Sequence, residues 1–176
     1  MKTLVAATAA VALLAAAPGL AGPSPYPNAL IQKATKMVRA KPGFSKAVLL
    51  EADGTPKAGT KVKTAAGIVN WRFVYNNQGT KGSKFRSAAL YYRNGKFGRF
   101  ARHTDPFVED KNIPVVPKMT LATAISKLRA AGHTQPFGAV TLRYPLMGWS
   151  EPLYIFGFGG GGYWTVGTKT GKVKPI

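Results

Sequence analysis

The sequence predicts an α+β fold made of two units, each with one helix laid on an antiparallel sheet. Each half of the chain opens with a segment of helical periodicity, continues with short alternating segments, and joins these by turn-forming residues. The order α-β-β-β therefore repeats, near residues 28–101 and near 120–176. Residue identity between the halves is low, so an α+β chain that has this order by chance is the competing interpretation.

The first residues have the pattern of an export signal. Met1-Lys2 precedes an apolar run, Leu4 to Ala17, and small residues lead to a break near Ala21. The run is shorter than the roughly 20 residues that span a bilayer. We therefore expect residues 1–21 to be a cleaved signal peptide and the mature protein to be secreted.

Residues 22–101 form the first expected unit. A helical stripe over 28–41 ends at Pro42-Gly43, and a β-rich run follows at 46–52. Residues 68–76 alternate, with Trp71, Phe73 and Tyr75 on one face, which is typical of a strand. The runs 86–93 and 96–101 flank Asn94-Gly95, the dipeptide that a type I′ hairpin turn requires.

Residues 102–119 are expected to be a linker, and residues 120–176 the second unit. The linker is rich in proline and lacks periodicity, which favours an extended chain. Thr120 has the side chain of a helix N-cap, and Gly132 stands where that helix would end. Alternating runs then predict strands at 137–143, 153–158, 163–168 and 172–174.

The composition excludes several kinds of chemistry. Twenty-five Lys and Arg oppose six Asp and Glu, giving a formal charge of +19, and there are two His and no Cys. A chain without Cys has no disulfide, thiol nucleophile, iron–sulfur cluster or Cys-based zinc site. With so few carboxylates and histidines, we predict a non-enzymatic protein with no catalytic residue, no metal site and no cofactor.

The second half carries the features of a known domain family. A helix with spaced alanines ends at a glycine, an aromatic strand follows, and a last hairpin carries a Thr-Gly-Lys-Val motif. These features are Ala122, Ala124, Ala130, Ala131 and Gly132, then Tyr154-Ile155-Phe156, then Thr170-Gly171-Lys172-Val173. This half resembles a PepSY-type domain, and the first half matches more loosely.

PepSY-type and cystatin-like domains both lay a helix on an antiparallel sheet, and secreted members often bind or inhibit proteases. Tandem units of this kind also occur in a bacterial hydrolase inhibitor. The cystatin inhibitory motifs, a Gln-x-Val-x-Gly hairpin and a Pro-Trp pair, are missing from this sequence. The resemblance therefore implies a fold and a class of partner, but no inhibitory residue.

Two apolar loops are the expected partner-binding residues. One surrounds the glycine run 159–162, and the other is the connection 144–149. Exposed aromatic side chains are typical interface anchors. The candidates are Trp149, Phe158, Tyr163, Trp164, Leu146 and Met147. Burial of these side chains within the fold is the alternative.

A basic, aromatic segment, residues 81–102, is the second candidate surface. It has no carboxylate, and Phe and Tyr alternate with cations, a pattern that suits single-stranded nucleic acid or another polyanion. The alternative is a half-buried sheet whose outer face Lys and Arg solvate. The candidate steering or polyanion-binding cations are Lys84, Arg86, Arg93, Lys96, Arg99 and Arg102.

The leading hypothesis is a secreted protein that binds another protein. Its narrowest form is an inhibitor of an extracellular hydrolase such as a protease, for example in a host-directed microbial effector. The alternative is a secreted basic module that binds nucleic acid, acidic polysaccharide or anionic membrane. Added salt separates the two, because polyanion binding weakens steeply with ionic strength.

Overall fold

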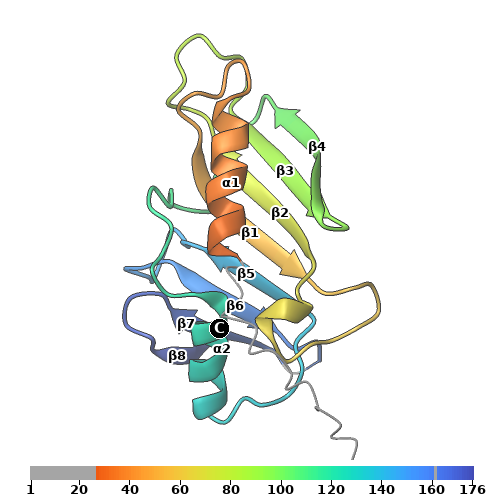
Figure 1. Cartoon of the computed structure of the whole chain (residues 1–176). Coiled ribbons are helices and arrows are strands. Elements are labelled where there is room, and N and C mark those ends of the chain that lie inside the picture. The colour runs from red at the N-terminus through yellow and green to blue at the C-terminus, as the bar shows by residue number, and fades with distance from the viewer. Residues whose placement is uncertain (1–26, 161) are drawn as a thin grey trace, which may run out of the picture.

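The protein forms one antiparallel sheet of eight strands with two helices on it. The structure is a computed structural model that describes residues 27–160 and 162–176, so the expected signal peptide lies outside the described residues. The strand order is β4-β3-β2-β1-β5-β6-β7-β8 (Figure 1). The elements are α1 Asn28–Arg39, β1 Val48–Thr55, the short helix η1 Ala65–Gly67, β2 Asn70–Asn76, β3 Ser87–Arg93, β4 Lys96–His103, α2 Leu121–Ala130, β5 Ala139–Arg143, β6 Leu153–Gly157, β7 Tyr163–Gly167 and β8 Val173–Pro175.

Local sequence explains the first half. The apolar stripe of α1 buries Leu30, Ile31, Ala34 and Val38 against the sheet. The β3–β4 turn has φ of 51° at Asn94 and 76° at Gly95, so the expected type I′ geometry is confirmed.

Local sequence also explains the second helix. The Thr120 hydroxyl accepts a hydrogen bond from the Thr123 backbone N–H, which confirms the expected N-cap. Leu121, Ala124, Ile125 and Leu128 are buried, and Gly132 follows the helix with φ of 94°. After α2 the chain forms strands β5 to β8, which lie next to one another in chain order as a meander.

The prediction of two helix-on-sheet units in α-β-β-β order is wrong. β1 pairs with β5 in antiparallel register, so both halves share one eight-stranded sheet instead of forming two separate units. The pairing joins two strand edges that would otherwise expose unpaired N–H and C=O groups. It also places Ala52 opposite Leu142 on the helix side, so a single hydrophobic core extends through both halves.

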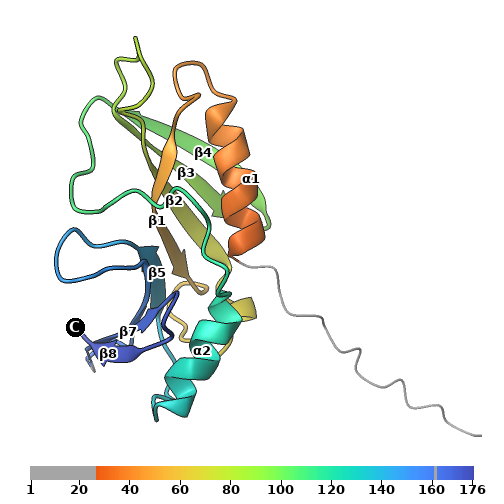
Figure 2. The same ribbon diagram turned by 90° about the vertical axis from the view of Figure 1, so that its left-hand side faces the viewer.

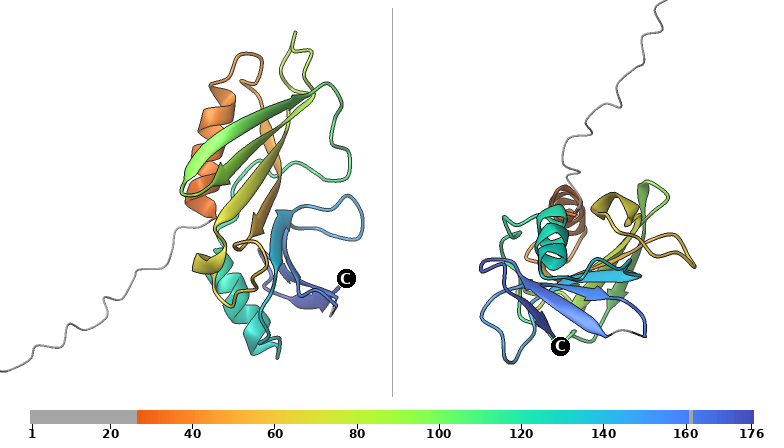
Figure 3. Two further views of the ribbon diagram at one scale, coloured as in Figure 1. Left: turned by 90° about the vertical axis from the view of Figure 1, so that its right-hand side faces the viewer. Right: turned by 90° about the horizontal axis from the view of Figure 1, so that it is seen from below.

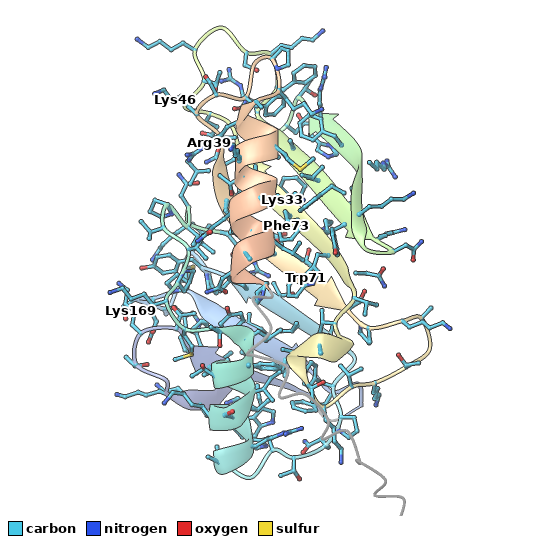
Figure 4. All side chains as sticks on the ribbon, in the orientation of Figure 1. Lys33, Arg39, Lys46, Trp71, Phe73 and Lys169 are labelled. Atoms are coloured by element: carbon cyan, nitrogen blue, oxygen red, sulfur yellow. The ribbon has the colours of Figure 1, made fainter. Side chains whose placement is uncertain are left out.

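The two helices cover the same face of the sheet. Seen from the side, α1 and α2 lie against one face, while the first part of the linker and the β5–β6 connection lie on the other (Figure 2). Further views show the helices one beyond the other along the twisted sheet (Figure 3). Trp71 and Phe73 of β2 point toward the helix layer and stack 6.1 Å apart (Figure 4). We call the opposite side the helix-free face.

Candidate functional site

A row of cross-strand neighbours runs along the helix-free face. Because side chains alternate along each strand, the residues between the core positions point to this face. Each member of the row is the Cα partner of the next, and all except Thr165 are at least partly exposed. This central row is Tyr91, Arg72, Asp53, Thr141, Ile155, Thr165 and Lys174.

A charge cluster occupies the middle of this face. Arg72 Nε donates to Asp53 Oδ2 at 2.7 Å, and Thr141 Oγ1 donates to Asp53 Oδ1 at 3.0 Å. Arg72 Nη2 lies 3.4 Å from Glu51 Oε1. These contacts join β1, β2 and β5, so the cluster reinforces the strand pairing at the centre of the sheet.

The same cluster attaches the linker. Arg143 of β5 donates from Nε to Asp110 Oδ1 at 2.8 Å, and its Nη2 lies 3.7 Å from Glu109 Oε2. The Ile113 N–H donates to the Leu49 carbonyl at 2.7 Å, so the linker extends along the free part of β1. We call Glu51, Asp53, Arg72, Glu109, Asp110 and Arg143 the central charge cluster.

Burial under the linker changes the acidity of this cluster. Desolvation, together with a hydrogen bond and charge repulsion from Asp53, raises the pKa of Glu51 from 4.5 to about 8, against the opposing effect of Arg72. Burial also raises the pKa of Asp110, although its hydrogen bond to Arg143 acts in the other direction. Burial therefore favours the protonated form of Glu51 in the folded protein.

The central charge cluster contains most of the acidic side chains of the protein. It holds four of the six Asp and Glu. Within residues 27–160 and 162–176, ion pairs involve no Lys or Arg other than Arg72 and Arg143. The remaining cations are spread over both halves, as Lys33, Lys46 and Lys169 illustrate (Figure 4). The outer surface therefore carries an almost uncompensated positive charge.

The candidate cations of the basic segment gather on the β3–β4 hairpin but not on one face. The guanidinium carbons of Arg93 and Arg99 each lie 5.6 Å from the centroid of the Tyr91 ring on the helix-free face. Lys96 pairs with Arg93 on that face. Arg102 instead lies over Phe85 and Phe100, which pack against the core on the helix side.

The other two candidates lie at the start of β3. Lys84 Nζ lies 5.4 Å from the Phe85 ring, and the Arg86 N–H donates to the carbonyl of His103. Cations of this segment thus lie over the faces of its own aromatic rings. Favourable cation–π contacts stabilise this arrangement.

The candidate aromatic loops do not form one patch. The connection 144–152 and the glycine loop 158–162 leave opposite ends of β6, so the two loops lie at opposite ends of that strand. Phe158 is 3% exposed and packs against Phe137 in the core. Trp164 is half-buried and lies 3.6 Å, between ring centroids, from His133.

Three of the candidate side chains are well exposed. Leu146 is 48% exposed and Met147 is 84% exposed at the tip of the β5–β6 connection, while Tyr163 is 59% exposed on β7. Trp149 is half-buried, its carbonyl accepts a hydrogen bond from Lys111 Nζ, and Lys174 Nζ lies 6.0 Å from its ring.

Sequence reasoning missed the linker as part of this surface. Phe107 and Val108 are exposed, and Asp110 is a member of the central charge cluster. The i, i+2 spacing of Glu51 and Asp53 in one predicted strand is a local signal that they share a face, but nothing local identifies Arg143 or Asp110 as their neighbours.

Comparison of the chain with protein-family models, with curated proteins and with solved structures finds no match. The resemblance to PepSY-type and cystatin-like domains therefore stays a prediction. Among the described residues, no group of His, Asp and Glu has the arrangement of a metal site. None of the helices in residues 27–160 and 162–176 has both the length and the apolar character that a membrane span requires.

Proposed function

We propose that this protein is a non-catalytic binding protein that docks a partner protein on its helix-free face. The observation that carries the proposal is the one-sided placement of the helices. Both long helices bury one face of a wide sheet, and no helix covers the other face, where the central row is partly exposed apart from the buried Thr165. A broad surface of this kind suits a protein partner better than a small substrate.

Exposed apolar side chains on that side supply the binding free energy. The β5–β6 connection and the first part of the linker lie on that side (Figure 2). Leu146 and Met147 belong to the first of these segments, Phe107 and Val108 to the second, and Tyr163 to β7; all five are exposed. Large apolar side chains in solvent mark interaction surfaces when they gather on one side of a molecule. Burial of one such side chain contributes about 1.5 to 3 kcal/mol.

The positive charge of the protein favours association with an acidic partner. Removal of residues 1–21 takes away Lys2 and lowers the formal charge from +19 to +18, and the acidic side chains are largely held in internal pairs. A partner with an acidic surface is therefore attracted at long range, and the rate of association falls as salt is added. The family resemblance implies an inhibitor of an extracellular hydrolase as the form of this function. The resemblance implies no inhibitory residue, and the exposure of the Leu146–Met147 tip favours this tip as the part that enters the cleft.

The test compares one variant at each end of the sheet. Tagged mature protein is exposed to extracellular fluid and to a panel of purified secreted proteases, at low and high salt. Met147→Asp places a charge at the most exposed apolar position of the helix-free face. Val69→Asp is the matched control, since Val69 is 44% exposed and follows η1 at the other end of the sheet from this loop.

We expect the wild type and V69D to retain the same partner at both salts, and M147D to bind it at least tenfold more weakly. Association rates should fall with salt while dissociation rates change little. Equal retention by M147D and the wild type would contradict the docking surface. Failure of the wild type to bind any extracellular protein at either salt would contradict the function itself.

A further inference from the structure

A hollow on the β3–β4 hairpin concentrates unpaired cations. It has a volume of about 200 Å³ and lies on the helix-free face. Its lining is Tyr91, Arg93, Asn94, Lys96, Gly98 and Arg99. Three of these residues are cations, none is a carboxylate, and no ion pair holds the three cations within the described residues. Such a hollow attracts an anionic group.

The hairpin geometry holds the two arginines in place. The type I′ turn brings Lys96 directly opposite Arg93, and the register of β4 against β3 shifts between Leu90 and Tyr92, beside Tyr91. Both guanidinium carbons lie 5.6 Å from the centroid of the Tyr91 ring. Contact with the ring reduces the freedom of these long side chains, so less entropy is lost when an anion binds.

A second hollow adjoins the first at Arg93. It has a volume of about 350 Å³ and lies between the β1–β2 connection and the start of β2. Its lining is Thr55, Pro56, Lys57, Ala58, Gly59, Thr60, Asn70, Arg93 and Gly138. Hydroxyl and amide groups therefore lie next to the cationic hollow, with one further lysine. Asn70 Nδ2 donates to the Pro56 carbonyl at 3.1 Å, which orients the amide beside Arg93.

These two hollows do not suit a nucleic acid base. Sequence-independent binding of single strands relies on bases stacking on open aromatic faces. In this hairpin Arg93 and Arg99 lie over Tyr91, and Lys84 and Arg102 lie over Phe85. The rings thus hold cations, and the second hollow has no aromatic residue in its lining.

We propose that the joined hollows bind an acidic polysaccharide. A sulfate or carboxylate group of one sugar lies against Arg93, Arg99 and Lys96, where guanidinium groups form paired hydrogen bonds to its oxygens. The hydroxyl groups of the adjacent sugar lie in the second hollow, against Thr55 and Asn70. The site is separate from the Leu146–Met147 tip and does not depend on the partner protein proposed above.

Titration calorimetry with oligosaccharides of defined length tests this site. The probes are a sulfated heparin hexasaccharide, a uronic acid hexasaccharide, a neutral maltohexaose, inorganic sulfate and a six-nucleotide oligothymidylate. The variants are Arg93→Ala and Asn70→Ala. Lys172→Ala is the matched control, because it removes one exposed charge on the opposite half of the sheet. Melting curves establish that each variant is folded.

We expect one or both acidic hexasaccharides to bind, and maltohexaose not to bind. R93A should weaken the binding of the acidic hexasaccharide at least tenfold, and K172A should weaken it less than twofold. N70A should weaken the hexasaccharide several-fold and leave inorganic sulfate unchanged, because only the sugar reaches the second hollow. M147D should leave hexasaccharide binding unchanged, which separates this site from the proposed protein-docking function.

Three results would overturn the proposal. Equal losses of hexasaccharide affinity in R93A and K172A would mean that binding depends on the overall charge of the protein and not on this hollow. Tighter binding of the oligothymidylate than of both acidic hexasaccharides, with the same dependence on Arg93, would assign the site to nucleic acid. An unchanged hexasaccharide affinity in N70A would remove the second hollow from the site.

Discussion

Replacing Glu51 by glutamine should abolish a pH dependence of the folding free energy. In the folded protein, burial and the neighbouring Asp53 raise the pKa of Glu51 from 4.5 to about 8. Between these two pH values the folded state holds a proton that the unfolded state releases. The free energy of unfolding of the wild type therefore falls as pH rises through this range, and the loss is complete above about pH 8.

The size of the effect follows from the shift. One pKa unit corresponds to about 1.4 kcal/mol, so ionisation of Glu51 removes on the order of a few kcal/mol from a total that is typically about 5 to 15 kcal/mol. Glutamine has the same shape, stays neutral, and does not titrate. We expect E51Q to match the wild type near pH 4.5 and to be more stable by a growing margin toward pH 9.

Urea unfolding at intervals from pH 4.5 to pH 9 measures this difference. Glu109→Gln is the matched control, since Glu109 belongs to the same cluster but its side chain is 83% exposed and lies 3.7 Å from Arg143. E109Q should track the wild type at every pH. Parallel pH profiles for E51Q and the wild type would refute the reasoning, because Glu51 would then ionise alike in both states.

Three further predictions concern stability and are checked by thermal and urea unfolding. Gly54→Ala should lower the free energy of unfolding by about 1 to 3 kcal/mol, because a Cβ at Gly54 would lie 2.8 Å from ring atoms of Trp71. An unchanged midpoint of unfolding would mean that the ring moves freely. Glu151→Ala should lower the free energy of unfolding by about 1 to 3 kcal/mol. This buried carboxylate accepts hydrogen bonds from the backbone of Lys169 and Thr170 and from the Thr170 hydroxyl. Full stability of the variant at neutral pH would contradict this role. Asn94→Ala should cost about 1 kcal/mol and Asn94→Gly almost nothing, because residue 94 has positive φ; equal losses in the two variants would argue against the turn.

Features that depend on near neighbours were open to prediction from the sequence. Helix α1 lies within the expected range 28–41, Thr120 caps α2, and Asn94-Gly95 makes the expected turn. Each depends on hydrogen bonds or steric limits among residues a few positions apart. The alternation in 68–76 likewise identified Trp71, Phe73 and Tyr75 as one face, and all three are in the core.

The assembly of these elements depended on contacts between distant residues. Thr141 and Asp53, hydrogen-bonded across the β1–β5 pairing, are 88 positions apart in the chain. Local pattern carries no information about which strand edges meet, so two separate units were expected where one sheet forms. The same limit hid the attachment of Asp110 to Arg143, and with it the burial that raises the pKa of Glu51.

The sequence by itself determined the local elements, the expected export signal and the excess of positive charge. Only the tertiary structure decided where that charge and the apolar side chains lie. Phe158 is buried because its backbone leads out of a core strand, whereas Met147 is exposed because its loop projects beyond the sheet. Alternation assigns side chains to two faces, but the helices decide which face is covered, and only the packed structure places both of them on the same side.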